Sequence, residues 1–84
     1  MIPRIKEIKP LDGFQLDVTF DDGYKVIYDV KDDIKSIPSF AILESEYKLF
    51  ENFQLDESRT CITWSEDVDL PSDTIREYGK AVLD

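Results

Sequence analysis

Residues 15–29 read QLDVTFDDGYKVIYD, and this stretch decides the fold. Apolar side chains alternate with polar ones on both sides of an Asp-Asp-Gly, a pattern typical of two strands joined by a tight turn. A two-residue turn at Asp22-Gly23 would place apolar side chains opposite polar ones. A three-residue turn, with Gly23 in the left-handed conformation, puts six apolar side chains on one face. These are Leu16, Val18, Phe20, Tyr24, Val26 and Tyr28. We therefore predict the three-residue turn.

The sequence on either side of this hairpin predicts one further strand and a helical segment. Residues 3–10 form the strand, with Ile8 as its core contact and its register undetermined. Residues 31–37 are ambiguous and compatible with one helical turn. Pro38 suits the first position of a helix, with Ser36 or Ile37 before it. Apolar side chains then recur at helical spacing and face a sheet, either in one helix or in two short helices that break near Ser45. They are Phe40, Leu43, Tyr47 and Phe50.

The second half of the chain predicts another hairpin and a last helix. Alternation at Phe53 and Leu55, a turn at 56–59, and alternation at Thr60, Ile62 and Trp64 indicate the hairpin. Ser72 is suited to be the N-cap of the helix. Its core face is expected to carry Ile75, Tyr78 and Val82, with Gly79 in mid-helix, where a closely packed neighbour would account for the glycine.

Together these elements predict one α+β domain spanning residues 1–84, with the strand order left open. Its order is an antiparallel β-meander of three strands, a helical segment, a second β-hairpin and a C-terminal helix that packs on the sheet.

The residue types exclude several classes of chemistry. With no His and one Cys among 84 residues, one chain cannot build a Ser-His-Asp triad, a thiolate zinc site or an internal disulfide. We expect no enzyme activity, no catalytic residue, no cofactor and no metal. Charges interrupt the first ten residues, and there is no apolar run of 18, so neither a signal peptide nor a membrane span is expected. The lone Cys61 favours a cytoplasmic location.

The charge is strongly acidic and unevenly placed. Residues 1–10 carry three basic and one acidic side chain, a net of +2, and the other 74 carry seven and eighteen, a net of −11. Such a field repels phosphate backbones and anionic lipids, so we expect no nucleic-acid or membrane binding. The acidity either keeps the protein soluble or forms a face for a basic protein partner.

The order of these motifs resembles the bacterial family called domain of unknown function 2442, over roughly residues 3–80. The matching positions are Phe20-x-Asp22-Gly23, Tyr28-Asp29-Val30, Phe40, Leu43, Phe50, Thr60-x-Ile62-x-Trp64 and Asp69-Leu70. Ser65 and Asp67 depart from the family, which often has Pro and Gly there. The resemblance implies a small α+β domain, usually free-standing, with no established reaction. It also implies a gene beside another short uncharacterised protein, as in toxin–antitoxin pairs.

Three aromatic residues are candidates for a ligand site. Trp64, Tyr28 and Tyr24 could line a pocket between sheet and helices, and the large face of Trp64 could stack on a planar or sugar ring. Core packing is the competing interpretation of Trp64, because Ile62 shares its strand face. In that case a buried indole N–H needs a hydrogen-bond partner.

The remaining candidates are carboxylates and the thiol. Asp67 and Asp69, in an acidic loop, could supply oxygen ligands for Mg²⁺ or Ca²⁺, but the loop lacks the EF-hand pattern. Asp69 is better suited to bonding backbone N–H groups at the start of the last helix. The carboxylates of the 29–33 segment are interpreted as solvated charges, and Cys61 as a half-buried inert thiol.

These considerations leave two hypotheses about function. The first is a non-catalytic protein-interaction module, antitoxin-like or adaptor, that recognises a basic partner encoded nearby. Exposed strand edges would add a second route to a partner, or to a homodimer. The alternative is a small-ligand-binding domain with its pocket near Trp64.

Overall fold

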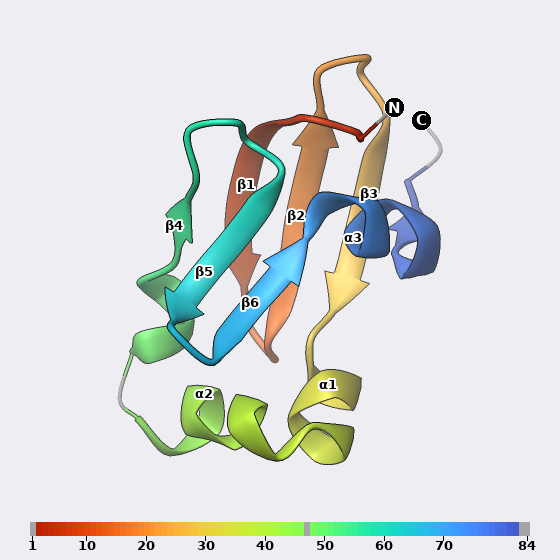
Figure 1. Cartoon of the computed structure of the whole chain (residues 1–84). Coiled ribbons are helices and arrows are strands. Elements are labelled where there is room, and N and C mark those ends of the chain that lie inside the picture. Colours follow the sequence, from red (N-terminus) through yellow and green to blue (C-terminus); the bar gives the residue numbers. More distant parts are fainter. Residues whose placement is uncertain (1, 47, 83–84) are drawn as a thin grey trace.

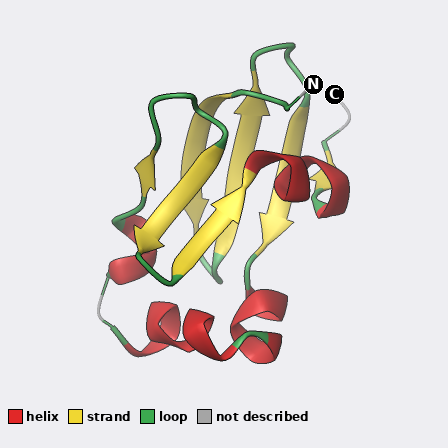
Figure 2. Cartoon of the chain, viewed as in Figure 1, coloured by secondary structure: helices red, strands yellow, loops and turns green. Residues whose placement is uncertain are grey.

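The computed structural model describes residues 2–46 and 48–82, which form two antiparallel sheets packed over one core. The smaller sheet and helix α3 lie across one face of the larger sheet, and the other helices gather at one end (Figure 1). The larger sheet has the order β1 (Ile5–Leu11), β2 (Gln15–Phe20), β3 (Lys25–Asp29) and β7 (Lys80–Ala81). The smaller has the order β4 (Gln54–Leu55), β5 (Cys61–Ser65) and β6 (Val68–Pro71). The helices are α1 (Lys31–Ser36), η1 (Pro38–Ala41), α2 (Ile42–Ser45), η2 (Leu49–Glu51) and α3 (Ser72–Tyr78). Figure 2 distinguishes these helices, strands and loops by colour.

The central hairpin has the predicted three-residue turn. Leu16 lies opposite Tyr28 and Val18 opposite Val26, and Gly23 has φ +87°. Five of the six apolar side chains on this face are buried. The exception is Tyr24, which is 38% exposed because it lies beside the turn, at the end of the sheet.

Strand β1 forms as predicted, but its main core contact was assigned to the wrong residue. Ile5 is fully buried, whereas Ile8 is partly buried against the core. A β-bulge between Ile5 and Glu7 shifts the alternation, so both isoleucines point toward the core although they are an odd number of residues apart. The pattern of side chains alone does not reveal such a bulge.

The helical segment takes the broken form of the two alternatives. Residues 31–36 form α1, and Pro38 begins a 3₁₀ helix rather than an α-helix. Helix α2 ends at Ser45, and Lys48 has φ +60°, so no continuous helix runs to Phe50. Phe40, Leu43 and Phe50 are nevertheless buried, and Tyr47 lies outside the described residues.

The second hairpin is confirmed, and a strand that the sequence did not predict extends it. Strand β4 pairs with β5, and β6 pairs with the other side of β5, where Leu70 lies opposite Ile62. Both Val68 and Leu70 in β6 are buried. The acidic residues around them in sequence hide this short apolar alternation.

The C-terminal helix differs from the prediction at both ends. Ser72 is the first helical residue rather than the N-cap, and its buried hydroxyl donates to the carbonyl of Pro3 at 2.6 Å. The helix ends at Tyr78, which is 73% exposed, and Val82 lies beyond it. Gly79 therefore caps the helix instead of lying within it. The following residues pair with β3 as β7, and this pairing competes with continuation of the helix.

No helix among the described residues is long and apolar enough to cross a membrane.

Candidate functional site

Trp64 lies in an aromatic cluster between the second sheet and the helical segment. It is 8% exposed, and its ring stacks on Phe50 with 5.9 Å between centroids. Phe40 and Phe53 contact it edge-on. Its indole N–H donates to the carbonyl of Phe50 at 2.9 Å. The packing interpretation of Trp64 is therefore correct, and the N–H has the partner that burial requires.

Tyr24 precedes β3 and Tyr28 lies near the other end of that strand, so the two do not meet around a ligand. Tyr28 is buried, and its hydroxyl donates to Asp33 of α1 at 2.6 Å. Burial, and then this hydrogen bond to a carboxylate, raise the pKa of Tyr28 well above its ordinary range. The ring of Tyr24 instead lies 4.3 Å from the guanidinium carbon of Arg76. The structure thus does not bring Trp64, Tyr28 and Tyr24 together.

Asp67 and Asp69 are exposed near the β5–β6 turn, and Asp69 lies within β6 opposite Thr63. Within residues 2–46 and 48–82, no three Cys, Asp or Glu side chains are arranged to hold a metal ion. The backbone-bonding role predicted for Asp69 is seen instead at Asp56. Its carboxylate accepts hydrogen bonds from the Ser58 hydroxyl and from the N–H groups of Thr60 and Cys61. These hydrogen bonds lower the pKa of Asp56, and the bond from Ser58 has the largest effect.

Cys61 is half-buried, and burial is the first cause that raises the pKa of its thiol. A thiol with a raised pKa holds little thiolate near neutral pH and is a poor nucleophile. This environment agrees with the interpretation of Cys61 as inert.

A groove of about 920 Å³ lies at the end of the molecule that carries the β2–β3 turn. Four stretches that are distant in sequence form it: the segment before β1, the β2–β3 turn, the β4–β5 loop, and α3. Its lining residues are Ile2, Pro3, Arg4, Phe20, Asp21, Asp22, Ser58, Thr60 and Arg76.

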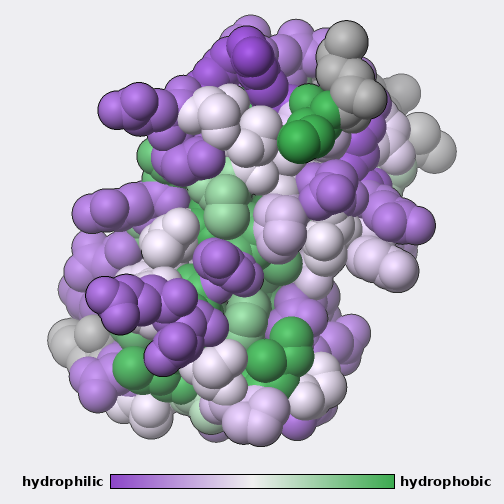
Figure 3. All heavy atoms as spheres, viewed as in Figure 1, coloured by the Kyte–Doolittle hydropathy of each residue, from purple (hydrophilic) through white to green (hydrophobic). Residues whose placement is uncertain are grey.

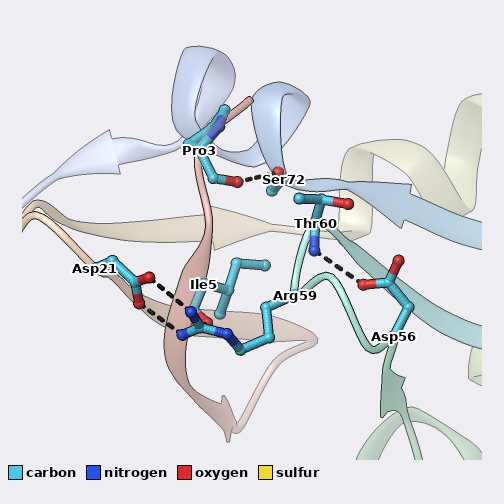
Figure 4. A network of polar contacts seen from close by, with 7 residues as sticks. All are labelled: Pro3, Ile5, Asp21, Asp56, Arg59, Thr60 and Ser72. Carbon is cyan, nitrogen blue, oxygen red and sulfur yellow. Dashed lines mark hydrogen bonds and ion pairs between the residues drawn. The ribbon is translucent and has the colours of Figure 1, made fainter. Parts of the chain in front are cut away.

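One wall of the groove is fixed by a two-pronged ion pair between Arg59 and Asp21. The guanidinium nitrogens lie 2.7 and 2.8 Å from the two carboxylate oxygens, and one of them also donates to the carbonyl of Ile5 (Figure 4). The hydrogen bonds from Arg59 hold the pKa of Asp21 below its ordinary value of 3.8. The pair joins the β4–β5 loop to the β2–β3 turn.

A second pair, between Arg76 and Asp22, fixes the opposite side of the same turn. Its two hydrogen bonds are 3.1 and 2.7 Å long. The guanidinium also lies over the rings of Tyr24 and Phe20, at 4.3 and 5.0 Å from their centroids. Such stacking suits arginine, whose planar group binds a carboxylate at its edge while its face meets a ring. The hydrogen bonds from Arg76 are the first cause of the lowered pKa of Asp22.

The segment before β1 is held on both sides. The Ser72 hydroxyl donates to the Pro3 carbonyl, as Figure 4 shows, and the Asp21 N–H donates to the Arg4 carbonyl at 2.9 Å. The Ile5 N–H donates to the Arg59 carbonyl at 2.8 Å. Residues 3–5 therefore form a fixed wall of the groove rather than a loose end.

Comparison with known proteins places this architecture in a family. The family model described as protein of unknown function, DUF2442, matches residues 5–81, which include three of the four stretches that form the groove. The chain belongs to this family. No curated protein and no solved structure matches the chain in the same comparisons. Membership confirms the resemblance seen in the sequence, and it attaches no known catalytic role to the chain.

The charged groups Asp21, Asp22 and Arg76 in the groove of this DUF2442 chain are held in ion pairs. Hydrogen bonds from Arg59 and Arg76 lower the pKa values of Asp21 and Asp22, respectively. The hydrogen bond to Asp22 raises the pKa of Arg76. These groups keep their charges across the neutral range, whereas acid–base catalysis needs a group that titrates near the working pH. The groove thus combines fixed charges, apolar atoms and hydroxyls.

Sequence reasoning missed this groove because each stretch is unremarkable alone. The sequence around Asp21-Asp22-Gly23 predicts a turn, and nothing in it indicates that Arg76, 54 positions later, lies beside that turn. The sequence held one signal: two adjacent carboxylates at the turn, Asp21 and Asp22, could pair with arginines, and the chain has only three, Arg4, Arg59 and Arg76. Only the fold shows that Arg4 and Arg76 line the groove and that Arg59 pairs with Asp21 in its wall.

Proposed function

We propose that this chain is a non-catalytic protein-interaction module, antitoxin-like or adaptor, whose partner is a basic protein encoded nearby. The observation that carries the proposal is the groove at the β2–β3 turn, which is lined by apolar, hydroxyl and charged residues and has two Arg–Asp pairs fixed in its walls. Fixed, fully charged groups around an open groove can select one binding partner over another without catalysing a reaction. A reducing cytoplasm suits the unpaired thiol of Cys61.

The surface charge supports a basic partner. The net charge is −9. Exposed carboxylates lie at both ends of the molecule: Asp56 and Glu57 are near the groove, and Glu44 and Glu46 are at the helical end. Figure 3 shows one face largely covered by hydrophilic residues, with smaller apolar areas between them. An acidic surface of this kind speeds encounter with a basic protein and slows encounter with an acidic one.

Strand addition at the β1 edge is not favoured. This edge carries Lys6, Lys9 and Pro10, and a bulge interrupts its start. Lysines, proline and bulges are the means by which sheet proteins block pairing with another chain. We therefore expect contacts through side chains, and we expect no homodimer built on β1.

The alternative, a small-ligand-binding domain with its pocket near Trp64, has less support than the interaction module. It required an open cavity beside Trp64 and Tyr28, and both residues are buried with their polar atoms bonded inside the protein. The proposal therefore does not depend on a small molecule.

Co-purification with the product of the neighbouring gene tests the function. The two proteins are expressed together and passed through gel filtration in about 50 mM and about 500 mM salt, which shorten the screening length from roughly 14 to 4 Å. Co-elution that weakens at high salt is the expected result. Separate elution at both salt concentrations, or turnover of a substrate by the purified chain, would refute the proposal.

A further inference from the structure

The three arginines at the groove are not used in the same way. Arg59 and Arg76 have their guanidinium forks filled by Asp21 and Asp22. Arg4 also lines the groove, but among residues 2–46 and 48–82 no carboxylate forms an ion pair with it. Its backbone is nevertheless fixed, because its carbonyl accepts the Asp21 N–H. An arginine with a fixed backbone and an unfilled fork is ready to receive a planar anion.

The two hydroxyls that line the groove together with Arg4 have a defined direction of hydrogen bonding. The Ser58 hydroxyl donates to Asp56 at 2.8 Å, so in its 2.6 Å contact with Thr60 the threonine must be the donor. A hydroxyl that has given its one proton keeps its acceptor lone pairs. Thr60 Oγ1 therefore presents an acceptor to the groove, which suits a backbone N–H.

The apolar part of the groove completes a chemical description of its ligand. Ile2 is 60% exposed, and Pro3 lies next to it, beside the cationic Arg4. A cation, an acceptor and apolar atoms in one open groove match an extended peptide with one carboxylate next to an apolar side chain. The charges in the walls select against a phosphate-rich ligand, because Asp21 and Asp22 repel a second and third negative charge.

We propose that this groove binds an extended peptide segment of the partner, with Arg4 receiving a single Asp or Glu side chain of that segment. The inference deepens the proposed function, because it names the site at which the interaction module anchors its partner. The partner remains basic overall, and the acidic surface attracts it over a distance. The lone carboxylate fixes the position of the bound segment at close range, where each hydrogen bond depends on geometry.

A peptide selection tests the groove without knowledge of the partner. The full chain is immobilised and used to select from a displayed library of random peptides about seven residues long, the span of one short strand. We expect the enriched peptides to share one Asp or Glu next to an apolar residue. Their affinity for the protein is then measured by fluorescence anisotropy, each beside a copy in which the acid is replaced by its amide.

Two substitutions and a matched control locate the contact. Arg4→Gln should weaken binding of the acidic peptides about tenfold and leave the affinity for the amide copies unchanged. Arg4→Lys should give an intermediate loss, because it keeps the charge and removes the fork. Lys35→Gln removes an equal charge from α1, at the other end of the molecule, and should leave binding as it is. Thermal melting confirms that each variant is folded.

Three results would overturn the inference: no enrichment, enriched peptides without a shared carboxylate, or acidic peptides that bind Arg4→Gln as well as the parent chain. This failure differs from failure of the proposed function. Salt-sensitive co-elution that Arg4→Gln leaves intact would keep the interaction module and move its binding site elsewhere. Peptide binding that depends on Arg4, with no co-eluting neighbour, would keep the groove and remove the proposed partner.

Discussion

Gly79 offers a sharp test of how the C-terminal segment is packed. Its backbone angles, φ −72° and ψ 155°, are open to any residue, so glycine is not needed there for its conformation. The reason is space. A Cβ built on Gly79 would lie 2.5 Å from the carbonyl oxygen of Ile75, and 2.9 and 3.0 Å from Cγ2 and Cβ of Val26. We therefore predict that Gly79→Ala destabilises the protein, although alanine has a higher helix propensity than glycine.

The size of the effect follows from what must move. Val26 is fully buried in β3, and the Ile75 carbonyl accepts the N–H of Gly79 at 2.8 Å, so neither atom can move freely. Overpacking a core costs about 1–3 kcal/mol, and a weakened capping bond adds roughly 1 kcal/mol. A total of about 2–4 kcal/mol is a large part of the roughly 4–12 kcal/mol expected for this length. The melting temperature should fall by about 10–30 °C.

Thermal and urea unfolding followed by circular dichroism measure this cost. Gly23→Ala is the matched control, because no heavy atom lies within 4 Å of a Cβ there and only the positive φ of +87° opposes it. It should cost about 1–2 kcal/mol. Val26→Ala should be less harmful in the Gly79→Ala background than alone, because it removes one of the crowded atoms. A stability of Gly79→Ala within about 0.5 kcal/mol of the parent chain would refute the packing argument.

Three further outcomes are expected in the same unfolding assays. Trp64→Phe should lower the free energy of unfolding by about 2–4 kcal/mol, because it leaves the buried Phe50 carbonyl without its donor and opens a small cavity; an unchanged urea midpoint would contradict this. Tyr28 has a raised pKa when folded, so its contribution is complete below pH about 10 and is lost as the pH rises further. Tyr28→Phe should flatten that alkaline decline, and an identical decline in both proteins would argue against it. Asp21 and Asp22 have lowered pKa values, so their contribution is present above pH 3.8 and is lost as the pH falls through the lowered values. The variant with Asn at both positions should lose less stability on acidification, and a matching acid profile would count against the ion pairs.

The central hairpin could be predicted from the sequence because its determinants are local. Alternation fixes which side chains share a face, and Gly23 fixes where the chain can turn with a positive φ. The same reasoning gave the second hairpin and the burial of Trp64. In both hairpins the deciding residues, 16–28 and 53–64, are close in sequence, within the range over which a pattern is informative.

The C-terminal helix was predicted, but its two ends were not, because distant residues decide them. Ile75, Tyr78 and Val82 have helical spacing, but the edge of β3 offers hydrogen bonds to residues 80–82 and ends the helix at Tyr78. Ser72 has the residue type of an N-cap, yet its hydroxyl donates a hydrogen bond to the carbonyl of Pro3, 69 positions earlier. Propensity is a weak guide where tertiary pairing competes with it.

The arginine–aspartate pairs connect the stability of the groove to its proposed use. Exposed ion pairs usually contribute little to folding. These two nevertheless hold neighbouring residues of one turn from two different elements, Arg59 of the β4–β5 loop and Arg76 of α3. This β2–β3 turn also fixes the backbone of Arg4, because the Asp21 N–H donates to the Arg4 carbonyl. A small displacement of the turn would therefore change the direction of the Arg4 guanidinium in the groove. Interactions that add little to the free energy of unfolding can thus determine binding, because a two-pronged hydrogen bond tolerates less displacement than a folded chain does.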